Sequence, residues 1–130
     1  MYCDADFTLD CTGDVVVGDV ILFKEGVFGG TYRKPKHLGN RAVIAEVVKD
    51  SYGAAKQQHT FTLKILDSWG TEPLKAETTT TRKGRNVYRK GTKRVPWNDE
   101  NARTKALEEK HARGSSARYQ RAVRKGEMIW

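Results

Sequence analysis

The most chemically distinctive part of the sequence is a run of cations between residues 82 and 94. It holds seven Lys and Arg side chains and no Asp or Glu. Lys and Arg neutralise phosphate groups and release their counterions, and Arg can grip a phosphate with two parallel hydrogen bonds. A tyrosine within the run could stack on an exposed base or sugar. We favour nucleic-acid binding over a solvated linker, with the candidate residues Arg82, Lys83, Arg85, Tyr88, Arg89, Lys90, Lys93 and Arg94.

Two further groups of cations suit the same chemistry. One follows an aromatic residue on a predicted loop, where Pro35 restricts the preceding residue to an extended conformation. The other lies on a predicted C-terminal helix, where cations at i, i+3 and i+6 could follow a phosphate backbone. An ordinary surface loop and an ordinary basic helix face are the alternatives. The candidate residues are Tyr32, Arg33, Lys34, Lys36 and Arg41 in the loop, and Arg118, Arg121 and Arg124 in the helix.

The net charge of +8 is distributed unevenly along the 130 residues. Residues 1–30 hold one base and six acids, whereas residues 81–130 hold fifteen bases and five acids. A strongly basic end favours polyanionic partners. The acidic start is expected to fold against the basic surface and screen it, or to repel non-specific anions.

The sequence shows no pattern typical of a catalytic site. His37, His59 and His111 are far apart, and none belongs to a recognisable nucleophile or metal motif. A divalent-metal nuclease with scattered carboxylates is the remaining enzymatic alternative. We therefore expect a protein that is not an enzyme and has no catalytic residues.

Metal and cofactor chemistry is also disfavoured. Cys3 and Cys11 have no second Cys pair or nearby His pair with which to hold zinc. An EF-hand loop counted from Asp4 would place Leu9 where glycine is required. We expect reduced thiols, no metal site and no cofactor.

The sequence gives two indications of compartment. No run approaches the length of a membrane span, and residues 1–10 are acidic, without the basic-then-apolar order of a signal peptide. We expect a soluble, cytoplasmic protein with no membrane partner, and association with the nucleoid is a further option.

The elements that must position these residues are mostly predicted strands. Residues 15–23 and 42–48 are apolar and β-branched, and residues 59–66 alternate apolar and polar side chains. Short strands with Gly-rich connections and no intervening helix favour a small antiparallel barrel. After Pro96, residues 99–113 and 117–125 predict two short helices, with Gly114 as the stop between them.

The stretch GDVILFKEGVFGG, followed by GNRAVIAEVVKD, resembles the KOW motif of SH3-like barrels. The resemblance covers roughly residues 15–66, and the insert TYRKPKHL departs from the family's short turn. It implies an SH3-like barrel and a choice of partners among RNA, DNA, ribosomes and RNA polymerase. Small basic phage proteins share this layout. The matching residues are Gly18, Asp19, Val20, Leu22, Gly26, Gly30, Gly39 and Val43.

These observations predict an α+β fold: a small antiparallel SH3-like β-barrel followed by a basic arm and two short C-terminal helices. The predicted units are an acidic segment at 1–14, the barrel at 15–75, the arm at 76–97 and the helical segment at 98–130. The leading function is non-enzymatic nucleic-acid binding, mainly to the phosphate backbone, with low sequence specificity and DNA slightly favoured over RNA. The alternative is an interaction module for RNA polymerase or the ribosome, with Trp97 and residues 128–130 as apolar anchors.

Overall fold

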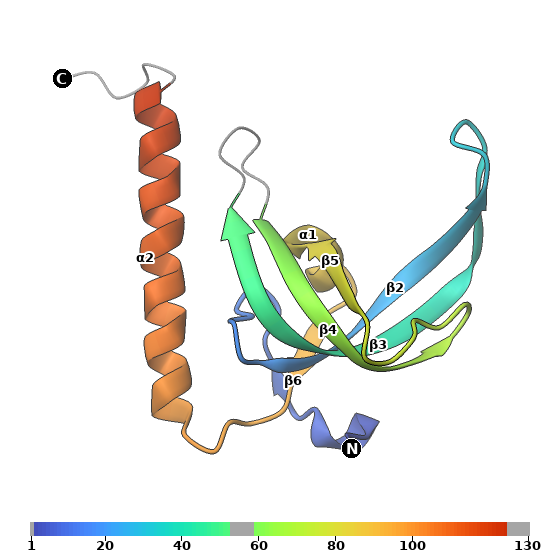
Figure 1. Ribbon diagram of the computed structural model, residues 1–130, viewed down its shortest axis with the longest axis horizontal. Helices are drawn as coiled ribbons and strands as arrows, with labels where there is room; N and C mark the ends of the chain where they lie inside the picture. Colours follow the sequence, from blue (N-terminus) through green and yellow to red (C-terminus); the bar gives the residue numbers. More distant parts are fainter. Residues whose placement is uncertain (1, 53–58, 125–130) are drawn as a thin grey trace.

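Within the described part of the chain, one bent antiparallel sheet of six strands forms the body of the molecule (Figure 1). The structure, a computed structural model, describes residues 2–52 and 59–124, and at Tyr52 and residues 113–124 it describes the backbone alone. The spatial order of the strands is β1-β6-β2-β3-β4-β5. The strands are β1 (Leu9–Asp10), β2 (Val20–Gly30), β3 (Pro35–Tyr52), β4 (His59–Gly70), β5 (Thr79–Lys83) and β6 (Thr92–Arg94), and the helical segments are η1 (Asp4–Asp6), α1 (Gly84–Tyr88) and α2 (Glu100–Arg124).

Apolar residues cover both faces of the three central strands. On the concave face, alternate residues such as Phe23, Val43 and Leu63 are fully buried together with Val87 of α1. On the convex face, Ile44 packs with neighbours that include a phenylalanine of the N-terminal segment. Each such side chain contributes roughly 1.5–3 kcal/mol by leaving water. The alternation predicted for residues 59–66 is present in β4, where the odd-numbered residues face the core.

The sheet is not closed into a barrel, because no described strand pairs β1 at one end with β5 at the other. Register shifts beside Phe28, Ala45 and Lys49 bend the long central strands, as bulges do. The bending alone does not close the sheet, because α1 carries the chain from β5 to β6 across the concave face (Figure 1). Val87 of α1 fills the core there. The predicted α+β fold built on an SH3-like barrel is therefore wrong.

The prediction that residues 76–97 form a separate basic arm is also wrong. This segment supplies β5, α1 and β6, and Val87 and Thr92 within it are fully buried. Gly91 has a φ of +87°, the left-handed conformation that lets the chain turn from α1 into β6. The cations do not prevent this folding, because two of them, Arg82 and Arg94, pair with carboxylates on other elements.

The two predicted C-terminal helices form one helix, α2, which continues through Gly114. A glycine inside a helix costs only about 1 kcal/mol relative to alanine, and the strong helix formers before Gly114 and after Ser116 outweigh it. Over residues 2–52 and 59–124, no helix is both long enough and apolar enough to cross a membrane.

Helix α2 is attached to the sheet through a buried carboxylate, Asp19, which lies in the turn before β2. Its Oδ1 accepts hydrogen bonds from Trp97 Nε1 at 2.7 Å and from Arg103 Nε at 2.9 Å. Its Oδ2 accepts from Arg103 Nη2 and from the backbone of Val16, both at 3.0 Å. Arg103 also donates to the carbonyl of Asp14 at 2.6 Å. Trp97, which the alternative function would use as an apolar anchor, donates its indole N–H to this junction.

A second cation of α2, Lys110, lies seven residues after Arg103 and also contacts the body of the protein. Lys110 is buried, its Nζ donates to the carbonyl of Val15, and it lies 3.4 Å from the hydroxyl of Tyr88. The ammonium also lies over the ring of Phe61, 5.2 Å from its centroid. Burial lowers the pKa of Lys110. Since seven residues are two helical turns, Arg103 and Lys110 share one face of α2 and attach it at two points.

The first prediction concerns the Asp19–Arg103 pair. Replacing Asp19 with Asn should lower the free energy of unfolding by about 3–5 kcal/mol, because it leaves the buried guanidinium without its carboxylate. Urea denaturation followed by circular dichroism measures the change, with the exposed Glu109→Gln on the same helix as control. The double variant Asp19→Asn/Arg103→Met should recover part of the loss. A loss below about 1 kcal/mol in Asp19→Asn would contradict the assigned role.

The second prediction concerns the link between β6 and α2. Glu100 accepts two hydrogen bonds from Arg94, at 2.8 and 2.9 Å, and one from the backbone of Trp97 at 2.8 Å. These bonds lower the pKa of Glu100 from 4.5 to about 2. The carboxylate therefore stabilises the fold fully above pH 4.5, and this contribution is lost as the pH falls towards 2.

Glu100→Gln tests this link. Because the carboxylate is half exposed, the variant should lose roughly 0.5–1 kcal/mol near neutral pH. Thermal melts should show a constant gap between wild type and variant from pH 8 to 5, and the gap should close below pH 4.5. Glu108→Gln, an exposed change on the same helix, controls for the removal of one negative charge. A gap that does not depend on pH would show that the effect has another origin.

Candidate functional site

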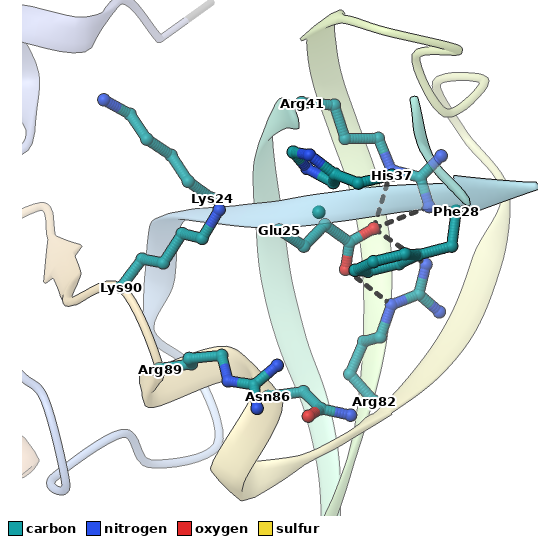
Figure 2. Close-up of a pocket in the computed structure, with 10 residues that line it drawn as sticks. Lys24, Glu25, Phe28, His37, Arg41, Arg82, Asn86, Arg89 and Lys90 are labelled. Carbon is teal, nitrogen blue, oxygen red and sulfur yellow. Dashed lines mark hydrogen bonds and ion pairs between the residues drawn. The ribbon is translucent and has the colours of Figure 1, made fainter. Parts of the chain in front are cut away.

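One side of β2 loses its partner strand in the middle of the sheet. β6 pairs with β2 only from Ile21 to Phe23, so beyond Phe23 no described strand covers this edge. Alternate backbone N–H and C=O groups of an uncovered edge point outward and are available to a ligand. A pocket of about 350 Å³ opens at this edge (Figure 2). This edge pocket is lined by Lys24, Glu25, Gly26 and Phe28 of β2, His37 and Arg41 of β3, Arg82 of β5, Asn86 of α1, and Arg89 and Lys90 of the turn after α1.

A carboxylate between two guanidinium groups forms one wall of the edge pocket, as Figure 2 shows. Glu25 accepts from Arg41 Nε at 2.6 Å and from Arg82 Nε at 2.9 Å. Arg41 comes from the strand opposite Glu25, whereas Arg82 comes from the far end of the sheet order. Nη2 of each arginine also contacts Glu25, and the Nη1 groups donate to backbone carbonyls and a threonine hydroxyl. The two arginines are therefore held in place before any ligand arrives.

The charge state of Glu25 is fixed by its neighbours. Burial by itself raises the pKa of a carboxyl group, but the hydrogen bonds from Arg82 and Arg41 outweigh burial and lower the pKa of Glu25. Glu25 is therefore an anion at neutral pH, and this set of three side chains carries one net positive charge.

Three exposed cations add to this charge. Lys24, Arg89 and Lys90 line the edge pocket, so it holds five cationic side chains against one carboxylate, a formal charge of +4 with His37 neutral. Lys90 Nζ donates to Asn40 Oδ1 at 2.8 Å, and Nε2 of His37 lies 3.2 Å from the same oxygen. The pocket is thus strongly cationic and open to solvent on the side of the lysines.

An exposed aromatic pair forms another wall. Phe28 is 61% exposed, and its ring centroid lies 5.2 Å from that of His37, its cross-strand partner, at an interplanar angle of 49°. Gly26 makes room for both rings, since a Cβ there would lie 3.0 Å from Phe28 Cε2 and 3.5 Å from His37 Nε2. The apolar face and the cations therefore border the same space.

A second hollow of about 280 Å³ adjoins the edge pocket and shares Lys24 and Lys90 with it. Lys93 adds a third cation there, but Asp4 and Asp10 of the N-terminal segment offset most of this charge. The hydrogen bonds from Thr12 lower the pKa of Asp10, so it is ionised at neutral pH. The acidic start of the chain thus lies against this part of the basic surface, as the charge distribution predicted.

The structure brings together only part of the predicted cation set. Arg41, Arg82, Arg89 and Lys90 meet in the edge pocket, and Lys93 lies in the second hollow. The remaining predicted residues of the loop lie towards the end of the β2–β3 hairpin and are exposed, and none of them lines the pocket. They are Tyr32, Arg33, Lys34 and Lys36.

Two predicted residues have structural partners instead. Tyr88 packs edge-on against Phe61, and its hydroxyl accepts from the backbone of Val15 at 3.1 Å, so its ring is not presented to a base. Arg94 is buried and paired with Glu100. Lys83 ends β5 and Arg85 lies on α1, and neither lines the pocket. Arg118, Arg121 and Arg124 lie on α2, where their side chains fall outside the described residues.

The candidate residues chosen from the sequence left out six lining residues of the pocket: Lys24, Glu25, Gly26, Phe28, His37 and Asn86. One available signal was the segment Lys24–Phe28 itself. It interrupts an apolar strand with two charges, and then places an aromatic two residues after a glycine. The pairing of Glu25 with Arg82 had no local signal, since 57 residues separate them.

The two cysteines differ in exposure, and neither forms a metal site in the described chain. Cys3 is exposed, whereas Cys11 is buried, and burial raises the pKa of its thiol to about 12. Among the residues whose side chains are described, no three His, Cys, Asp or Glu side chains gather in a way that could hold a metal ion.

Comparisons with known proteins give a family and one long relative. The chain is 44% identical over 128 residues to "Zinc finger CCCH domain-containing protein 62" of Oryza sativa subsp. japonica. The match covers 95% of this chain but only 18% of the relative. No solved structure matches. A family model described as "Domain of unknown function (DUF7699)" matches residues 11–97, which include strands β2 to β6 and every lining residue of the edge pocket. The chain therefore belongs to the DUF7699 family.

Proposed function

We propose that the protein is a non-enzymatic nucleic-acid-binding protein that holds phosphate groups at the edge pocket. The observation that carries this proposal is the convergence of five cations from β2, β3, β5 and the turn after α1 on one pocket with a single carboxylate. Cations scattered only for solubility would have no reason to meet across four elements of the fold. A phosphate group is a ligand of matching charge and size.

The cations divide into two kinds. Arg41 and Arg82 are already oriented by Glu25, which reduces the conformational entropy lost when they meet a ligand. Lys24, Arg89 and Lys90 are exposed, and of these Lys90 also donates to Asn40. The two oriented arginines would fix the geometry of the contact with phosphate, and the three exposed cations would supply most of the electrostatic attraction. This arrangement supports phosphate recognition with low sequence specificity, since phosphate contacts carry no sequence information.

The proposal does not depend on zinc. The rice relative is named for a CCCH zinc finger, but this chain has two cysteines in all, too few for the three that such a finger needs. Both DNA and RNA suit the phosphate chemistry of the pocket. Asp4 and Asp10 leave the second hollow less positive than the edge pocket.

The third prediction tests the pocket cations directly. The variant Lys24→Ala/Arg89→Ala/Lys90→Ala should bind a fluorescent 20-nucleotide DNA or RNA at least tenfold more weakly at low salt. Each phosphate contact contributes about −0.7 to −0.9 to the slope of log K against log salt, so the slope should become shallower by about 2 to 3. Fluorescence anisotropy at three salt concentrations measures both quantities.

A matched control removes the same charge elsewhere. Lys49→Ala/Lys75→Ala/Lys105→Ala changes three exposed lysines that line neither the edge pocket nor the second hollow. This variant should keep at least a third of the wild-type affinity. Equal losses in the two variants would mean that net charge alone drives binding. Absence of binding by the wild type at low salt would reject the proposed function and favour a protein partner.

A further inference from the structure

We infer that the edge pocket takes one unpaired nucleobase, so that the preferred ligand is single-stranded nucleic acid, with Phe28 as the stacking platform. This inference rests on the proposed function and adds the strandedness of the ligand and the residue that selects it. Three observations support it: the exposure of Phe28, the space beside it, and the way the cations surround that space.

Phe28 is a large apolar residue that the fold leaves exposed to solvent in β2. It is 61% exposed on the edge pocket, while Ile21, Phe23 and Val27 of the same strand are buried. A solvated phenylalanine among five cations contributes little to folding. Its flat face is, however, what a base requires, since every base has a π-face and stacking tolerates all sequences.

The space beside the ring depends on Gly26. A side chain at this position would push into the ring of Phe28, with its Cβ 3.0 Å from Cε2. The ring packs against that of His37 and lines the pocket beside Glu25 (Figure 2). The volume of about 350 Å³ falls at the lower end of the range for small-molecule sites, which suits one nucleotide.

Polar groups surround the stacking face on the remaining sides. Asn86 on α1 is exposed and lines the pocket, and its side-chain amide can both donate to and accept from the edge of a base. The outward-pointing backbone groups of the uncovered β2 edge offer the same two functions. Lys24 and Lys90 lie at the boundary with the second hollow, where a flanking phosphate would lie.

A duplex does not satisfy this geometry. Its bases are stacked and paired inside the helix, so they reach the face of Phe28 only after unstacking, which costs a few kcal/mol. A single strand presents its bases at no such cost. Phosphate attraction to the same cations acts on both forms, so the preference for a single strand should depend on Phe28 and not on the lysines.

Three probes of equal length separate the base from the phosphates. They are a 20-nucleotide oligo-dT or oligo-U, the matching duplex, and a strand of abasic sites with the same phosphates but no bases. Wild-type protein should bind the single strands at least fivefold more tightly than the duplex and the abasic strand. Phe28→Ala should lose about 5- to 100-fold in affinity for the single strands and less than twofold for the other two probes.

Two more variants complete the test. Phe28→Trp retains the aromatic platform and should bind single strands at least as well as wild type. Tyr32→Ala removes a fully exposed aromatic of the same hairpin that does not line the pocket, and it should change none of the three affinities. Circular dichroism melts should show all three variants folded, since neither side chain belongs to the core.

The outcomes distinguish the inference from the proposed function. Equal affinity of the wild type for all three probes, or equal losses on all probes in Phe28→Ala, would overturn the inference. If the Lys24/Arg89/Lys90 variant still lost affinity in that case, the proposed phosphate binding would stand. A loss in Tyr32→Ala as large as that in Phe28→Ala would move the stacking site to the end of the hairpin and also overturn the inference.

Discussion

One buried carboxylate, Asp19, determines how the C-terminal part of the chain meets the sheet. A carboxylate without access to water is tolerated only with full pairing. Asp19 obtains it from four hydrogen bonds, donated by Val16, Trp97 and Arg103. This requirement brings the segment after β6 back beneath the start of β2, and so sets where α2 begins. A long, mostly polar helix can then dock without a wide apolar face. At its other end β6 begins only at Thr92, opposite Phe23 and after the turn that follows α1, and this late start leaves the edge of β2 beyond Phe23 uncovered.

The local pattern of the sequence predicted the strands better than their arrangement. The alternation of residues 59–66 and the β-branched residues of 42–48 identified the central strands, because burial of alternate side chains follows directly from a repeat of two. Barrel closure and the basic arm were wrong for a shared reason. Whether residues 82–94 stay in solvent depends on partners distant in the sequence, such as Glu25 for Arg82. It also depends on the burial of Val87, which lies in the sequence between Gly84 and Gly91. The merged C-terminal helix shows that one glycine is a weak stop when its neighbours favour helix.

The candidate site was likewise predictable from the sequence only in part. Clustered Arg and Lys predicted the sign of the surface, and four of the predicted cations do meet in one pocket. Charge density alone could not separate the cations that face solvent from Arg94, which serves the fold. Nor could it find Phe28, since an aromatic residue in a strand is ordinarily assigned to the core. Its exposure follows from the bend of the β2–β3 hairpin and from Gly26, both of which are properties of the assembled sheet.

The open sheet has a consequence for association between copies of the protein. Uncovered strand edges, such as β2 beyond Phe23 and the outer side of β5, can pair with a strand of another molecule and start aggregation. Lys24 and Arg82 stand on these edges, so two copies that approach edge to edge repel each other. The cations that would attract phosphate therefore also oppose self-association by electrostatic repulsion. A polyanion that neutralises them removes this repulsion, and crowding along a long nucleic-acid strand would then favour contacts between neighbouring copies of the protein.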